Sequence, residues 1–86
     1  MNLKIMIPNK IIWDDAVSRI AADGISGAFG ILPNHIDFVE ALEPGILVLQ
    51  SESGEETFGA LDRGILIKQG DDVLISAINA VLGTEL

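Results

Sequence analysis

The segment ILVLQSESGEETFGALDRGILIKQGDDVLISA, residues 46–77, decides the fold class. It contains apolar runs at residues 46–50, 56–61, 65–68 and 73–77, and polar or glycine-containing turns separate them. Turns that recur roughly every 8 to 12 residues between β-branched runs are typical of a β-sandwich or a β-barrel. The sequence therefore predicts an all-β domain with little or no helix.

Residues 46–50 give the strongest strand signal in the chain. They are apolar on both faces of an extended strand, which favours a central strand. The polar residues 51–55 then predict a turn, so that residues 46–50 and 56–61 form a hairpin.

Outside this segment the pattern is less decisive. Residues 3–7 alternate as a half-buried strand, which Pro8-Asn9 ends. Residues 16–22 fit helix or strand by pattern, and we predict a strand because a helix there spans barely two turns. Residues 36–42 are ambiguous up to the turn at Glu43-Pro44-Gly45, and residues 78–82 extend the last strand or begin a helix. An apolar and acidic segment starts at Thr84-Glu85-Leu86.

Composition limits the classes of partner. The 86 residues make one small domain, and we treat residues 1–86 as a single unit because no linker or repeat divides them. Five Lys and Arg residues against 13 Asp and Glu residues give a formal charge of −8, which makes nucleic acid and anionic membrane surfaces poor partners. The absence of cysteine excludes disulfides and thiolate metal sites. No signal peptide or membrane-spanning run is expected.

Residues 24–38 are the candidate contact loop. They concentrate three glycines, Pro33, two phenylalanines and the single histidine of the chain. Glycines allow sharp bends, while apolar residues between them supply anchors. For Phe29 the sequence favours a core position and an interface position equally, whereas we assign Phe58 and Trp13 to the core.

Motifs for catalysis, metals and cofactors are weak throughout. The repeat Gly24-x-x-Gly27-x-x-Gly30 is neither a dinucleotide-binding nor a phosphate-binding loop. His35 has no second histidine beside it, and Asp37 is the one candidate for orienting its ring. Asp14-Asp15 and Asp71-Asp72 lack the ligand spacing of a calcium loop. We therefore predict no catalytic residue, no cofactor and no metal.

A family resemblance follows from residues 24–66. The strings Gly27-x-Phe29-Gly30-Ile31-Leu32-Pro33-x-His35, Ala41-Leu42-x-Pro44-Gly45 and Gly64-Ile65-Leu66 resemble the epsilon subunit of F-type ATP synthases. The resemblance covers essentially the whole chain. His35-Ile36-Asp37-Phe38-Val39, where the family commonly has a histidine followed by Ala-Pro-Leu, resembles the alternate, sodium-type branch.

The resemblance implies a flattened β-sandwich of about ten short strands at the foot of the central stalk. It implies binding to the gamma subunit and the c-ring, on the cytoplasmic face of the membrane without insertion, and no small-molecule substrate. The interface positions it carries over are Phe29, Ile31, His35 and Glu40. Ala28 departs from the acidic residue and Glu40 from the small hydroxyl residue of the common pattern.

The family's C-terminal helical hairpin would begin about where this chain ends, so its inhibitory and ATP-binding functions are not expected in residues 1–86. Two functions remain open at this point. One is a non-catalytic coupling subunit, and the other is a free-standing β-domain that binds a ligand or partner through His35 and Asp37. The transported ion, proton or sodium, is open as well.

Overall fold

The computed structural model describes residues 1–83, and they form ten strands without a helix. The strands are β1 (Asn2–Ile7), β2 (Lys10–Ala16), β3 (Arg19–Gly24), β4 (Gly27–Ile31), β5 (Phe38–Leu42), β6 (Gly45–Gln50), β7 (Glu56–Leu61), β8 (Gly64–Gln69), β9 (Asp72–Ala77) and β10 (Ala80–Leu82). The predicted all-β class is confirmed. The segment expected to start at Thr84 lies outside the described residues.

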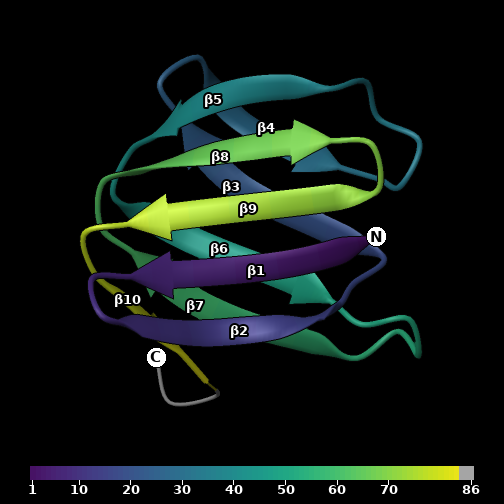
Figure 1. The fold of residues 1–86 in the computed structure, drawn as a ribbon, viewed down its shortest axis with the longest axis horizontal. Coiled ribbons are helices and arrows are strands. Elements are labelled where there is room, and N and C mark those ends of the chain that lie inside the picture. Colours follow the sequence, from purple (N-terminus) through teal and green to yellow (C-terminus); the bar gives the residue numbers. More distant parts are fainter. Residues whose placement is uncertain (84–86) are drawn as a thin grey trace.

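The strands lie in two layers (Figure 1). The front sheet has the order β5-β8-β9-β1-β2, and the back sheet has the order β4-β3-β6-β7-β10. All pairs are antiparallel except β1 with β9. A single pair, Gly24 with Leu42, links β3 to β5 and so joins the two sheets along one side. The two layers of short strands confirm the predicted β-sandwich of about ten strands. Its principal extents are 27, 27 and 25 Å, and Figure 1 shows the strands of the back sheet running obliquely to those of the front sheet.

The core lies between the sheets and follows the period of two along each strand. In β1 the buried residues are Leu3 and Ile5, and in β6 they are Leu47 and Leu49. As predicted, β6 is central, between β3 and β7, and it forms a hairpin with β7.

The strand predicted for residues 16–22 is interrupted where the chain changes sheets. The Val17 backbone N donates to the Met1 carbonyl of the front sheet at 2.9 Å, and the Ser18 backbone N donates to the Gln50 carbonyl of the back sheet at 2.8 Å. β2 therefore ends at Ala16 and β3 begins at Arg19. Local sequence did not predict this break because it is made by two partners far away in the chain.

Phe58 does not lie in the core, contrary to the sequence-based prediction. Its side chain is 44% exposed on the outer face of β7, while Gly59 and Leu61 face inward. A Cβ at Gly59 would collide with the side chain of Leu82, so β10 fills the space that Gly59 leaves open. Trp13 is partly buried and packs against the core, in agreement with its assignment.

Candidate protein-interaction surface

The predicted contact loop is largely a hairpin. β3 and β4 pair from Ile20 with Ile31 to Gly24 with Gly27, so only Ile25 and Ser26 form the turn. Gly27 has φ +113°, a conformation that strongly favours glycine at this turn. The irregular part of the stretch is confined to residues 32–37.

Phe29 and His35 meet on one side chain, that of Phe38. The rings of Phe29 and Phe38 pack edge to face, with centroids 5.9 Å apart and an interplanar angle of 87°. The imidazole of His35 is tilted on the same phenylalanine, with centroids 4.8 Å apart. Phe29 is partly buried against the core, whereas His35 is exposed. The structure thus brings two of the four predicted interface residues together.

Ile31 is the predicted interface residue that the structure places elsewhere. Its side chain has 0% exposure and belongs to the core. β4 presents alternate residues to opposite sides, and Ile31 pairs with the buried Ile20 of β3. Ile31 therefore does not meet the condition for an anchor, which is a side chain that a partner can reach.

Glu40 contacts the β3–β4 turn. Its Oε2 accepts a hydrogen bond from the Ser26 backbone N at 3.2 Å, and its side chain packs where a Cβ at Gly24 would lie. The Ile25 backbone N also donates to the Ala41 carbonyl, at 3.0 Å. Glu40 therefore holds the turn against β5, and Ile25, 69% exposed, forms its apolar tip.

Asp37 does not orient His35. Its Oδ1 accepts a hydrogen bond from the Gly70 backbone N at 2.8 Å, while the Nδ1 of His35 lies 2.9 Å from the Ile36 carbonyl oxygen. Among the side-chain hydrogen bonds of residues 1–83, the imidazole of His35 is bonded to a backbone carbonyl and to no carboxylate. Within residues 1–83 no three His, Cys, Asp or Glu residues gather in a way that could hold a metal ion.

Lys68 lies beneath the same loop and is the one buried charged residue of the described chain. It is 2% exposed, and its Nζ donates to the Gly70 carbonyl at 2.6 Å. Gly70 is therefore held by Lys68 at its carbonyl and by Asp37 at its N–H.

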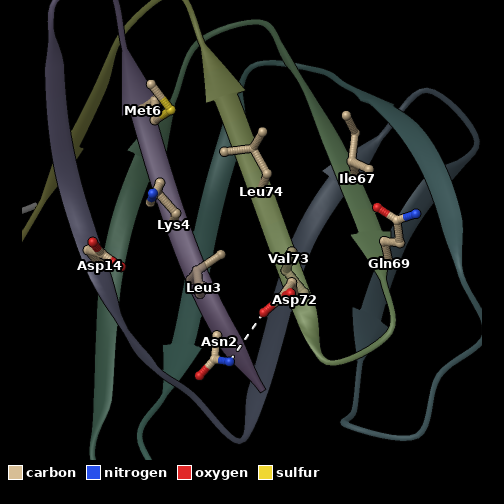
Figure 2. Close-up of a pocket in the computed structure, with 10 residues that line it drawn as sticks. All are labelled: Asn2, Leu3, Lys4, Met6, Asp14, Ile67, Gln69, Asp72, Val73 and Leu74. Atoms are coloured by element: carbon tan, nitrogen blue, oxygen red, sulfur yellow. Dashed lines mark hydrogen bonds between the residues drawn. The ribbon is translucent and has the colours of Figure 1, made fainter.

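One surface of the structure was not predicted from the sequence. The outer face of the front sheet carries a row of apolar side chains, which we call the front apolar face: Met6, Ile11, Val39, Ile65, Ile67 and Leu74. Val39 is 62% exposed and Ile65 40%. Part of this face is hollowed over β1, β8 and β9. Met6 and Leu74 lie next to Lys4 there, and Ile67 lies beyond Leu74 on β8 (Figure 2).

An exposed apolar sheet face is a common sign of a binding surface. The sequence did contain its signal, because residues 65–67 and 73–75 are apolar at successive positions rather than alternating. In residues 46–50 the same signal predicts a central strand, and β6 is central. In β6, however, Ile46 is 53% exposed on the outer face of the back sheet, near Phe58.

The fold and these surfaces define a class of protein, a small β-sandwich module with exposed apolar faces and a paired β3–β4 hairpin. No helix in the described residues has the length and hydropathy needed to cross a bilayer. Residues 1–83 match the family model for the β-sandwich domain of the ATP synthase delta/epsilon chain. The chain belongs to this family, as its sequence resemblance predicted.

Similar proteins agree with this assignment. An ATP synthase epsilon chain from Prochlorococcus marinus is 34% identical over 86 residues, which are 100% of this chain and 63% of that protein. A chloroplastic epsilon chain from Anthoceros angustus is also 34% identical over 86 residues, or 62% of its length. The chain thus spans less than two thirds of the length of these curated relatives.

Two solved structures share the fold. A chain of the Euglena gracilis mitochondrial ATP synthase, in a structure of OSCP, F1 and the c-ring, has a TM-score of 0.88 and 26% identity over 93% of this chain and 51% of its own. A chain from the central stalk and c-ring of the Tetrahymena thermophila mitochondrial ATP synthase has a TM-score of 0.77. At 18% identity over 94% of this chain and 65% of its own, the second likeness concerns the fold alone.

Proposed function

We propose that this chain is a non-catalytic central-stalk subunit of an F-type ATP synthase. In this role it binds the gamma subunit and the c-ring at the cytoplasmic face of the membrane and couples ion translocation to ATP synthesis or hydrolysis. Family membership and the named complexes of the similar structures support this proposal.

The front apolar face is the observation that carries the gamma contact. It is a broad, regular surface on a rigid sheet, and packed interiors transmit strain instead of absorbing it. A subunit that passes torque needs such a surface rather than a flexible loop. Phe29 and His35 pack on Phe38 of β5, whose side chain lies on the opposite face of that strand from Val39, so they flank this contact at the edge of the sandwich.

The c-ring contact is assigned to the β3–β4 turn, at one end of the sandwich. Ile25 forms an exposed tip there, and Glu40 holds the turn in place from β5. Phe29, His35 and Glu40 thus keep roles in or beside the interfaces, with Glu40 acting through the turn that it supports.

A pair of isoleucine variants tests the proposal. We expect the wild-type chain to co-purify with gamma, Ile65→Asp on the front apolar face to lose the complex, and Ile46→Asp on the back sheet to keep it. The two residues are matched, because both are strand isoleucines with similar exposure on opposite sheets. Failure of the wild-type chain to bind gamma would refute the function, and equal effects of the two variants would refute the assignment of gamma to this face.

A further inference from the structure

Lys4 lies in a hollow of the front face whose lining combines apolar side chains with polar ones, among them the carboxylates of Asp14 and Asp72. It lies on β1 with Leu74 of β9 beside it in register, and Met6 and Ile67 line the same hollow of about 580 Å³. Figure 2 shows its side chain rising from the middle of β1 between β2 and β9. Among the residues that line the hollow, it is the only lysine or arginine.

The ammonium group of Lys4 has no ionic partner among residues 1–83. Asp14 of β2 lies directly opposite Lys4 in the antiparallel register. Even so, the one ion pair in the described chain joins the Met1 amino group to Asp71, at 3.7 Å. The second carboxylate of the hollow, that of Asp72, already accepts a hydrogen bond from the Asn2 side chain at 3.2 Å. In the free domain, Lys4 is therefore exposed to solvent without an ion pair.

A partner that covers the front apolar face removes the solvent around Lys4. Burying a charge without a compensating group carries a large desolvation penalty, whereas a carboxylate at hydrogen-bond distance offsets it. The stem of a lysine packs readily on apolar neighbours, so only the ammonium group needs a polar contact. A domain with a formal charge of −8 repels an acidic partner surface at most positions. A single cation within the contact therefore strongly favours one position of the partner on the sheet.

We propose that the protein partner on this face places an acidic side chain against Lys4, so that Lys4 fixes the position of the partner on the sheet. The inference rests on the proposed function, in which gamma covers the front apolar face. It adds the chemistry of the matching surface, which is an apolar patch that contains one carboxylate.

The test compares Lys4→Glu with Lys10→Glu in titrations of the chain with gamma. Both variants change the formal charge by the same amount and both residues are exposed on the front sheet, but Lys10 lies outside the hollow. Lys4→Glu should weaken the complex at least tenfold, and Lys10→Glu should change it by less than threefold. Melting temperatures of the isolated variants verify that both are folded.

Four results would overturn the inference. Equal weakening by the two variants would show that net charge acts instead of position. Unchanged binding of Lys4→Glu, with normal binding of the wild-type chain, would refute the Lys4 contact and leave the proposed function intact. A loss with Asp14→Asn as large as that with Lys4→Glu would show that Lys4 pairs within its own sheet when covered. Absence of wild-type binding would refute the proposed function itself, and this inference with it.

Discussion

Gly70 donates its backbone N–H to Oδ1 of Asp37 across 2.8 Å, although the two residues are 33 positions apart. This bond ties the irregular residues 32–37 to the turn between β8 and β9. On the other side of the same glycine, Lys68 holds the carbonyl from within the core. The loop that carries His35 is thus fixed by its contact with this turn, not by regular strand pairing.

Replacing Asp37 with alanine should loosen this loop. The loss of one hydrogen bond to a charged acceptor at the surface is expected to cost about 1 kcal/mol of the free energy of unfolding. The sharper measurement is hydrogen exchange at the Gly70 amide, which should accelerate in Asp37→Ala. Asp62→Ala is the control, because Asp62 accepts only from its neighbour Arg63 in another turn. An unchanged exchange rate of the Gly70 amide in Asp37→Ala would show that the hydrogen bond to Asp37 does not hold the loop.

Ile31 and Val39 should separate stability from binding. Ile31→Ala removes fully buried methyl groups, so we expect a loss of about 2 to 5 kcal/mol in the free energy of unfolding. Val39→Ala, on the exposed front face, should leave unfolding almost unchanged and weaken the gamma complex. Chemical denaturation and gamma titration of both variants measure this, and a stable Ile31→Ala domain with poor gamma binding would speak against the buried position.

Phe29→Ala should lower both the stability of the domain and its affinity for gamma, each by a modest amount. The stability loss comes from the edge-to-face packing of Phe29 on Phe38, because aromatic pairs contribute about 0.5 to 1.5 kcal/mol beyond their buried area. We expect a partial drop in melting temperature together with weaker gamma binding. Phe29→Leu retains apolar volume without the aromatic edge, so it should recover most of the stability. A wild-type melting curve for Phe29→Ala would place the residue outside the core contact seen here.

Lys68→Met should leave stability unchanged within about 1 kcal/mol or raise it. Methionine keeps the buried aliphatic stem while removing an ammonium group that is costly to desolvate, and apolar replacement of buried charges is often neutral or stabilising. Lys68→Ala, which leaves a cavity instead, should be clearly destabilised. Urea denaturation of the two variants measures this difference. A decrease of more than about 2 kcal/mol in the free energy of unfolding of Lys68→Met would mean that the hydrogen bond to the Gly70 carbonyl contributes more than the desolvation of the charge costs.

Glu40→Ala should loosen the β3–β4 turn locally and change the global stability of the domain only slightly. Removing the carboxylate leaves the Ser26 backbone N without its partner and opens space over Gly24. We expect faster exchange at the Ser26 amide, near-normal melting, and gamma binding less affected than in Val39→Ala. Glu40→Gln keeps an amide oxygen as acceptor and should restore slow exchange. If Glu40→Ala abolished gamma binding while the Ser26 amide stayed protected, Glu40 would be a direct contact instead.

Sequence alone determined the all-β class, most of the turns and the family, whereas strand β4 and the break between β2 and β3 were not predicted. Glycine, proline and polar clusters end strands locally, and short apolar runs between them admit few other interpretations. The glycine, proline and histidine positions from Gly27 to His35 identified the epsilon-type domain, which the family match confirms.

Tertiary structure decided which side of each strand faces the core. Alternation shows that a strand has two faces, but apolar residues on both faces of β6, β7 and β8 leave the choice open. Phe58 points outward because Leu82 occupies the space over Gly59, and Ile31 points inward because β4 pairs with β3. Asp37 bonds Gly70 because β8 pairs beside β5. Each of these outcomes depends on a partner distant in the chain, so no local pattern could contain it.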